Sequence, residues 1–437
     1  MTDPHFTLRA PVARRVPLVL ASIAAIGGAA LVSLATFGNT EGRAQAQVDP
    51  LASLTWQPLP GDAPLGGHAA ILAADSMTLI GGERADFQPP DSVRALRLDG
   101  AQPTWANRAE TGDRPQSALI GRGLLSARTV RISADDAAET QSLTLCHCLA
   151  GTTYAARWPA GDGGVGWRKV AGAQPLPYGS GLLAFDAARH RVIAAGGEFE
   201  GAGDVVTATW ALDVGHVETA EWRALPSLPF QLMFQAADRD PRSGDLVAFG
   251  GQGPDAVPTA KLWRADLAAV DNADAWTDAT ALAGDGPLAR SGATLTFLGN
   301  SGVAVLIGGY APGQGELADI WALDYTDPAA PSWRALTPAG AAPSPRSGHS
   351  AVWDGARRRV IVYGGLRLQG DGVAYLSDAI ALALEPGAEP TTAVPTATTS
   401  TATTAVPTAV PTESTPSSGG RIFLPNALKS ADARNGL

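Results

Sequence analysis

Two glutamates stand where a carboxyl group could do acid–base chemistry. Glu83 and Glu198 each follow directly after a glycine pair, Gly81-Gly82 and Gly196-Gly197. A carboxyl group that is buried beside another one has a raised pKa and can exchange a proton at neutral pH. Glutamates in loops are also commonly solvated and without a chemical role. The sequence leaves both interpretations open, with catalysis by these two residues the weaker one.

A second candidate for chemistry is the tripeptide Cys146-His147-Cys148. It lies in a strand-like run, 142–149, in which alternate side chains point to opposite faces, so both thiols face one side and the imidazole faces the other. This geometry disfavours one metal ion held by all three side chains. Inert buried thiols, a local or intermolecular disulfide, and a metal site stay open as alternatives, and an oxidising compartment would favour the disulfide.

No other metal or cofactor site is expected from the sequence. His68 and His349 occupy the same position of an internal repeat, which favours a structural role. No glycine pair is followed by the Lys-Ser/Thr of a phosphate-binding loop, and the sequence holds no nucleophile elbow.

The composition excludes several broad classes. The 437 residues carry a formal net charge of −10, with 50 Gly, 33 Pro and two Cys. The acidic balance disfavours non-specific nucleic-acid binding, which needs a basic surface. Two cysteines cannot build a disulfide framework or a four-ligand zinc site. Low charge with much Gly and Pro favours many short strands and turns over a helical bundle.

Residues 1–47 have the pattern of an export segment. Arg9, Arg14 and Arg15 precede an uncharged apolar run, 16–38, and Ala44-Gln45-Ala46 supplies a small-x-small cleavage site. The apolar run is long enough to span a bilayer. A signal peptide cleaved after Ala46 and a retained membrane anchor therefore both stay open. In either case we expect the bulk of the protein to be extracellular or at the cell surface.

The C-terminal part divides into a stalk and a tail. Residues 387–420 are mostly Thr, Ala, Val, Pro and Ser without aromatics, so they cannot form a core. Their proline content favours an extended, disordered stalk with hydroxyls for O-glycans, although a tail without a role is the alternative. Residues 421–437 begin with Arg421-Ile422-Phe423-Leu424-Pro425. This resembles the short Phe-Leu-Pro tail of some bacterial surface proteins and favours sorting or attachment.

An internal repeat organises the chain between these ends. Glycine pairs recur about every 55 residues with one interval twice as long, and tryptophans keep the spacing through that gap. The pairs are Gly81-Gly82, Gly196-Gly197, Gly250-Gly251, Gly308-Gly309 and Gly364-Gly365, and the tryptophans are Trp56, Trp105, Trp167, Trp222, Trp276 and Trp333. These spacings indicate six units, the second of which has lost its glycine pair.

Each unit contains four predicted strands. In the last unit a strand opens at 346–353, a turn follows at Asp354-Gly355, Val360–Tyr363 is apolar enough to be buried on both faces, and Asp378–Leu382 is the third strand. The repeated tryptophan lies on the fourth strand, which the last unit lacks. We therefore predict an all-β, six-bladed propeller whose last blade is completed by the N-terminal strand Leu54–Leu59, which closes the ring.

The units resemble Kelch repeats, the propeller repeat that also builds the central domain of galactose oxidase. The opening Arg346-Ser347-Gly348-His349-Ser350, the glycine pair after the second strand and the tryptophan on the fourth carry the resemblance over residues 52–386. It implies that the loops after the glycine pairs and the loops leading into each first strand share the ligand-binding face. The copper site of galactose oxidase is not expected, because no matching set of His and Tyr is seen.

On that face the resemblance predicts a ring of equivalent residues, one from each blade. Alignment of the units on Asp186, Asp238 and Asp354, and on the glycine of Arg-Ser-Gly elsewhere, gives Leu65, Arg114, Tyr178, Phe230, Arg290 and Arg346. Three guanidiniums and two aromatic rings would suit a carboxylate-bearing sugar or an acidic peptide. The alternative is that the arginines support neighbouring loops by bonding to carbonyls.

The favoured function is an exported module that binds protein or carbohydrate ligands on its loop face. We expect a monomer without cofactor and without a nucleic-acid partner, attached to the membrane or cell envelope through either end. The alternative is a carbohydrate-active isomerase or mutarotase on the same fold. It requires Glu83 or Glu198 within hydrogen-bonding reach of Arg114, Arg290 or Arg346.

Overall fold

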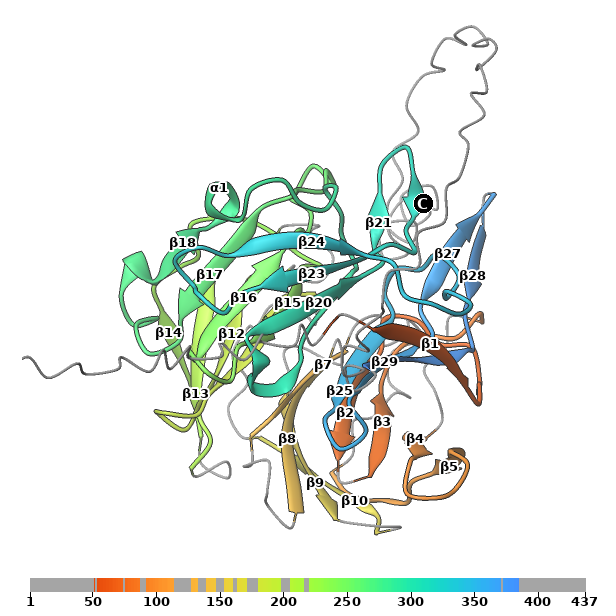
Figure 1. Ribbon diagram of the computed structural model, residues 1–437. Coiled ribbons are helices and arrows are strands. Elements are labelled where there is room, and N and C mark those ends of the chain that lie inside the picture. The colour runs from red at the N-terminus through yellow and green to blue at the C-terminus, as the bar shows by residue number, and fades with distance from the viewer. Residues whose placement is uncertain are drawn as a thin grey trace, which may run out of the picture. The chain divides into compact units, whose positions relative to one another are not determined.

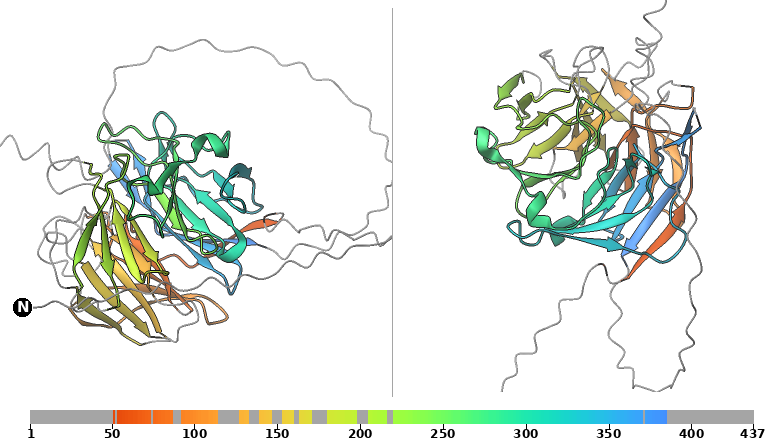
Figure 2. Two further views of the ribbon diagram at one scale, coloured as in Figure 1. Left: turned by 90° about the vertical axis from the view of Figure 1, so that its left-hand side faces the viewer. Right: turned by 90° about the horizontal axis from the view of Figure 1, so that it is seen from above.

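The computed structural model describes the chain from Leu51 to Leu384 with gaps. The described residues are 51, 53–73, 75–86, 92–113, 127–132, 139–146, 153–159, 163–170, 180–197, 205–215, 220–370 and 372–384. Within them, six sheets of four or five strands surround a common centre (Figures 1 and 2). This is the predicted six-bladed propeller. The predictions for residues 1–47, 387–420 and 421–437 lie outside the described residues.

The first three blades come from the N-terminal half of the chain, and each runs from an inner strand at the centre to an outer strand at the rim. Blade 1 consists of β2 (Ala69–Ala73), β3 (Ser76–Ile80), β4 (Arg94–Arg97) and β5 (Thr104–Asn107). Blade 2 consists of β7 (Ala127–Arg131), β8 (Glu139–Cys146), β9 (Thr153–Pro159), β10 (Val165–Lys169) and the added parallel strand β6 (Glu110–Gly112). Blade 3 consists of β11 (Leu182–Asp186), β12 (Arg191–Ala195), β13 (Thr209–Asp213) and β14 (Trp222–Leu225).

The other three blades follow in the same order. Blade 4 consists of β15 (Ala236–Arg239), β16 (Asp245–Phe249), β17 (Leu262–Asp266) and β18 (Trp276–Asp278). Blade 5 consists of β19 (Thr294–Phe297), β20 (Val303–Ile307), β23 (Ile320–Asp324) and β24 (Ser332–Leu336). Blade 6 consists of β25 (Ser350–Asp354), β26 (Arg359–Tyr363), β29 (Ala379–Leu384) and β1 (Leu54–Leu59). Helical turns in the described ranges are short: η2 (Ala273–Ala275), α1 (Thr280–Ala283) and η3 (Gly299–Ser301). No helix in those ranges is long and apolar enough to span a membrane.

The core lies between the blades. Each blade presents both faces to its neighbours, so its second strand must be apolar on both sides. In β20, all five residues from Val303 to Ile307 are buried, and the same holds for β3 and β12. This explains the continuous apolar run of β20, although β3 and β12 also bury the polar side chains of Ser76, Thr78 and Arg191.

The ring closes as predicted. Strand β1 pairs antiparallel with β29 from Leu54 opposite Leu384 to Leu59 opposite Ala379. Trp56 packs into the core shared by blades 5 and 6. Its backbone N–H donates to the carbonyl of Ala339 (2.8 Å), in the segment that leaves blade 5. The N-terminal strand is therefore bonded along both of its edges.

The glycine pairs lie where the backbone of the next blade crosses. Gly364 and Gly365 have φ of +59° and +101°, values that side chains rarely tolerate. The Gly365 N–H donates to the carbonyl of Leu65 (2.8 Å), which leads into blade 1. A Cβ on Gly364 would lie 2.5 Å from that same carbonyl oxygen. The glycine pair thus leaves room for the backbone of the next blade, which a side chain at Gly364 would displace.

Arginine side chains link neighbouring blades at the end of the propeller away from the glycine pairs. Arg191 of blade 3 bonds its own Asp186 and reaches Asp271 of blade 4 at 2.7 Å. Arg242 of blade 4 donates to the carbonyl of Tyr325 in blade 5, and Arg357 of blade 6 reaches Asp75 of blade 1. Paired with Arg191 and Arg223, the Asp271 carboxyl has a pKa well below its usual range.

Candidate functional site

The loops after the glycine pairs and the loops leading into the inner strands meet on one side of the propeller. Isolated β-bridges join Gly66 to Glu83, Met233 to Gln252, Ser291 to Tyr310, and Ser347 to Leu366. In each bridge the second residue directly follows a glycine pair, and the first leads into the inner strand of the same blade. We refer to these two sets of loops as the glycine-pair face.

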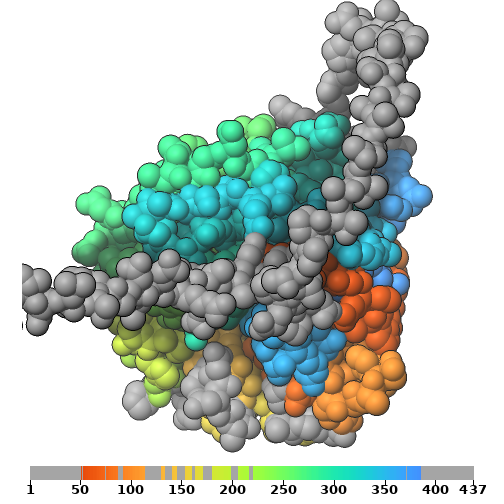
Figure 3. Space-filling view, viewed as in Figure 1, coloured from red at the N-terminus to blue at the C-terminus, as the bar shows by residue number. Residues whose placement is uncertain are grey.

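Two hairpins extend this face. The loop of blade 5 forms β21 (Tyr310–Ala311) and β22 (Gly315–Glu316), and the loop of blade 6 forms β27 (Leu366–Gln369) and β28 (Gly372–Tyr375). Figure 1 shows both hairpins standing clear of the blades, and β27–β28 forms a blue projection in Figure 3. The backbone of Leu368 bonds the Glu316 carboxylate, which links the two hairpins.

Arg290 and Arg346 lie beneath this face, inside their own blades. Both are 1% exposed. The Arg346 guanidinium donates to the carbonyls of Ser344 and Gly364 and to the Asp378 carboxylate (2.6 Å). Arg290 makes the matching set, and its contact with Asp319 is bidentate at 2.6 and 2.9 Å. The geometry is that of loop support, the alternative left open by the sequence, because these donors are already occupied.

The ladder register corrects the predicted ring in two blades. Across the hydrogen-bonded strands of blade 4, Arg239 lies in line with the outer-strand tryptophan, as Trp353 does in blade 6, whereas the sequence alignment had put Ala237 there. Asp240, and not Asp238, is therefore the equivalent of Asp354. The ring position of blade 4 is then Leu232 instead of Phe230. Phe230 stacks on Trp263 with ring centroids 4.4 Å apart, within the core shared by blades 3 and 4.

In blade 2 the same register places Arg131 in line with the outer-strand tryptophan, as Trp353 is in blade 6. Arg114 precedes Arg131 by 17 residues, whereas Arg346 precedes Trp353 by seven, so the sequence alignment of this blade is not supported. Arg114 and the Tyr178 of blade 3 both lie outside the described residues. Leu65 of blade 1 keeps its place in the ring and is buried.

The described residues do not form the predicted acid–base arrangement. Glu83 is buried, and its carboxylate accepts a hydrogen bond from the Tyr375 hydroxyl on β28. Burial and this carboxylate raise the pKa of Tyr375 above its usual range. Glu198 lies outside the described residues, and so do His147 and Cys148. Among the described residues no group of three or more His, Cys, Asp or Glu side chains could hold a metal ion.

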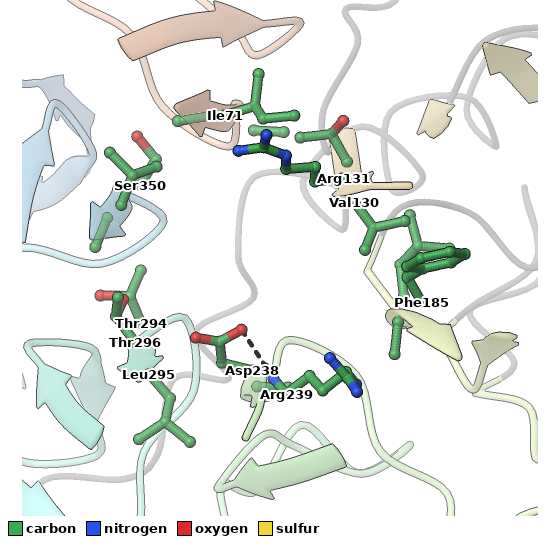
Figure 4. Close-up of a pocket in the computed structure, with 18 of the residues that line it drawn as sticks. Ile71, Val130, Arg131, Phe185, Asp238, Arg239, Thr294, Leu295, Thr296 and Ser350 are labelled. Carbon is green, nitrogen blue, oxygen red and sulfur yellow. Dashed lines mark hydrogen bonds between the residues drawn. The ribbon is translucent and has the colours of Figure 1, made fainter. Parts of the chain in front are cut away.

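A channel of about 760 Å³ runs through the centre, lined by the inner strands of all six blades (Figure 4). At the end nearer the glycine pairs, His68 Nε2 lies 2.8 Å from Ser350 Oγ, and His349 Nε2 lies 2.9 Å from Thr294 Oγ1. Each pair joins one blade to the preceding one. Burial lowers the pKa of His68 to about 3 and holds that of His349 well below its usual value, so both are neutral links.

Comparisons with known proteins agree with this architecture. Residues 183–388, which span blades 3 to 6, match the KLHDC2/KLHL20/DRC7 Kelch-repeats domain. These four blades are Kelch repeats, within a six-bladed β-propeller. A solved structure described as that of YjhT shares the fold, with a TM-score of 0.51 and 12% identity over 75% of this chain and 98% of that one. Comparison with curated proteins gave no match.

Asp238 lines the channel, and its carboxyl group has a raised pKa. Its carboxylate accepts hydrogen bonds from the backbone N–H groups of Phe297 in blade 5 and of Arg239, each at 2.8 Å. Burial raises the pKa of Asp238 to about 6, and these two hydrogen bonds oppose the rise. The carboxyl therefore links blades 4 and 5 at a position where its charge is costly.

This shift predicts a pH dependence of stability. An unfolded Asp titrates near 3.9, so the folded state binds the proton more tightly, and stability falls as pH rises from about 4 to about 6. Relative to Asp238→Asn, which cannot ionise, the wild type should lose about 2–3 kcal/mol of unfolding free energy between pH 4 and pH 8. Chemical denaturation at several pH values measures both proteins, and shared titrations such as those of the histidines cancel. Parallel pH profiles would contradict the assignment.

Sequence reasoning missed the polar side chains of this channel. Gln235, Asp238 and Arg239 line it from blade 4, and Arg131 lines it from blade 2. A signal was available in the repeat, since Arg131 and Arg239 each stand 36 or 37 residues before the outer-strand tryptophan of their blade. The degenerate second unit concealed this equivalence.

Proposed function

We propose that this Kelch propeller is an exported, non-enzymatic interaction module that binds a protein or carbohydrate partner on its glycine-pair face. The observation that carries the proposal is the pair of linked hairpins, β21–β22 and β27–β28, on a rigid six-bladed frame. Loops on such a frame can vary without disturbing the core. The hairpins present Tyr310, Arg367 and Tyr375, the residue types that most often dominate binding interfaces.

Exposed apolar side chains add to the same face. Val257 and Leu288 are 58% and 57% exposed. They come from adjoining segments, because the Arg290 N–H bonds the carbonyl of Thr259. Exposed apolar groups beside aromatic and arginine side chains are typical of interaction surfaces.

The isomerase alternative is not favoured by the geometry. The Glu83 carboxylate accepts a hydrogen bond from Tyr375, while Arg290 and Arg346 are bonded to Asp319 and Asp378. Acid–base catalysis at this face required Glu83 or Glu198 to lie within reach of Arg114, Arg290 or Arg346, and of these residues Glu198 and Arg114 lie outside the described part of the chain.

Export and attachment form part of the proposal and rest on the sequence. Residues 1–47 would direct the chain out of the cytoplasm, and residues 387–420 would hold the propeller away from its attachment point. Protease added to intact cells that make the full chain should cut the protein, and N-terminal sequencing of the mature form would distinguish cleavage after Ala46 from a retained anchor. Full protection in intact cells, with cutting after lysis, would contradict export.

The interaction proposal is tested by mutating the face. Ligands are first identified by probing glycan and protein arrays with the labelled full chain. For any ligand found, the double substitution Val257→Ser and Leu288→Ser should weaken binding at least tenfold, because apolar groups at an interface centre carry much of its affinity. Leu282→Ser is the matched control within the same loop, since Leu282 is 50% exposed but lies at the rim of the face, on α1 beside the outermost strand β24. Equal loss in both proteins, or no loss in either, would contradict the assignment of the face.

A further inference from the structure

A chain of backbone hydrogen bonds passes from blade to blade around the channel at its glycine-pair end. It joins described residues of five blades, and in each bond a backbone N–H donates to the carbonyl of the equivalent residue in the preceding blade. The bonds run from Gly67 to Gly348 (2.8 Å), from Gly348 to Gly292 (2.8 Å), from Gly292 to Phe234 (2.9 Å) and from Phe234 to Ser180 (2.8 Å). The residue after each of these lines the channel, and we refer to this layer as the collar: His68, Gly181, Gln235, Ala293 and His349.

Gln235 is the collar residue whose whole polar group lacks a partner. Its side chain is 3% exposed, and neither its amide nitrogen nor its amide oxygen has a hydrogen-bond partner among the described residues. In blades 1 and 6 the imidazole at this place meets a hydroxyl at the start of the preceding inner strand, Ser350 or Thr294 (Figure 4). The residue there for Gln235 is Leu182, which offers no hydroxyl. A buried amide left unsatisfied is costly, and such groups in native proteins usually have a partner.

Blade 4 also departs from the repeat at the residue before Gln235. Phe234 has a φ of +57°, whereas its equivalents in blades 1, 5 and 6 are the glycines Gly67, Gly292 and Gly348, with φ of +64°, +66° and +59°. A side chain in this conformation carries a backbone cost that glycine avoids, and such strain is concentrated at functional sites. Two departures from the repeat therefore occupy adjacent positions of one blade.

The part of the channel beside Gln235 is apolar. Its two neighbours in the collar are Gly181 of blade 3 and Ala293 of blade 5, so neither brings a polar side chain to the amide. Leu182 and Ala236, the next residues of blades 3 and 4, also line the channel. The channel volume of about 760 Å³ is within the range of small-molecule sites in proteins.

The collar is also uncharged. The charged channel residues of blade 4, Asp238 and Arg239, follow Gln235 by three and four residues, which is about 10 and 13 Å along an extended strand. Burial lowers the pKa of both His68 and His349, so their imidazoles are neutral at pH 7. A polar but neutral surrounding favours an uncharged ligand over an ion, which would lose its hydration without gaining a counter-charge.

We propose that the channel binds a small uncharged carboxamide with an apolar body at Gln235. The ligand N–H donates to Gln235 Oε1, and Gln235 Nε2 donates to the ligand carbonyl. A primary carboxamide suits this place because it presents a donor and an acceptor side by side, as the Gln235 amide does. Its apolar body lies toward Leu182 and Ala236. The site is inside the channel and does not rest on the function proposed for the glycine-pair face.

The test uses benzamide as the probe and the full chain at pH 7.5. Saturation-transfer NMR, titrated to about 10 mM benzamide, measures dissociation constants in the millimolar range and should show saturable binding. Benzoate has a similar shape but carries a charge and no N–H, and N,N-dimethylbenzamide lacks the N–H. Each should bind at least tenfold more weakly, because a site built to hydrogen-bond a group rejects analogues without it.

Substitution of Gln235 gives two independent readouts. Gln235→Leu should weaken benzamide binding at least tenfold, because it removes both hydrogen-bonding groups. The same variant should unfold at a urea concentration no lower than the wild type, because the amide that it removes has no partner among the described residues. Gln57→Leu is the matched control, since Gln57 is exposed on β1, the outermost strand of blade 6.

Benzamide binding that is lost in Gln235→Leu and kept in Gln57→Leu supports the site. The proposal is overturned by a lack of saturable benzamide binding, by equal binding in Gln235→Leu, or by benzoate that binds as tightly as benzamide. If Gln235→Leu does not fold, Gln235→Met decides by the same criteria, since methionine is unbranched like glutamine. Lower stability of both variants would show that Gln235 supports the fold and would also overturn the proposal.

Discussion

Replacing Trp56 with alanine should lower the free energy of unfolding by about 3–5 kcal/mol, the usual cost of removing a large aromatic side chain from a core. Trp56 is 4% exposed and packs with Leu382 and Val360. Because β1 is the outermost strand of blade 6, its loss also exposes the edge of β29. Urea denaturation followed by circular dichroism measures the change.

Gln57→Ala is the matched control for this prediction. Gln57 neighbours Trp56 on the same strand but is exposed, so its replacement should change stability by less than about 0.5 kcal/mol. Amide exchange should also become faster along β1 and β29 in the Trp56 variant. A Trp56→Ala protein as stable as the control would show that the N-terminal strand does not close the ring.

Arg346→Ala should destabilise the protein by about 2–4 kcal/mol, because it removes one partner of a buried charged network. The substitution leaves the carbonyls of Ser344 and Gly364 without their donor and Asp378 without its ion pair. Arg346→Lys should recover only part of the loss, since an ammonium group lacks the fork that reaches three acceptors. Thermal and urea denaturation measure both variants.

The same variants separate the two roles considered for this arginine. If Arg346 belonged to a ligand-binding ring instead, its substitution would leave the free energy of unfolding nearly unchanged and would abolish ligand binding. Arg97→Ala, which removes an exposed arginine paired with Asp99, gives the scale of a surface substitution and should cost less than about 1 kcal/mol. An Arg346→Ala protein no less stable than Arg97→Ala would contradict the supporting role.

The repeat made the fold predictable. Spaced glycine pairs and tryptophans fix the number of blades, and the unmatched tryptophan at residue 56 indicates which strand completes the last one. These sequence signals can be recognised because each has a local physical cause. A glycine pair leaves room where the next blade's backbone crosses, and a second strand such as β20 is apolar because both of its faces are covered.

The residues of the candidate site were harder to predict from the sequence, for two reasons. Asp238 and Asp240 are two residues apart and therefore point to the same face of a strand. Alignment on the wrong aspartate preserves the pattern while it shifts the ring position from Leu232 to Phe230. The direction of Arg290 could not be inferred locally either, because its partner Asp319 follows 29 residues later, after the β21–β22 hairpin.

The central claim, that partners bind the glycine-pair face, is tested most directly by site-specific photo-crosslinking. A photoreactive residue is placed at Gln369, at the exposed tip of the β27–β28 hairpin, or at Ala356, in the exposed turn at the opposite end of the same blade. With a ligand found on the arrays, we predict covalent adducts from position 369 and background labelling from position 356. Adducts from position 356 with none from position 369 would contradict the claim.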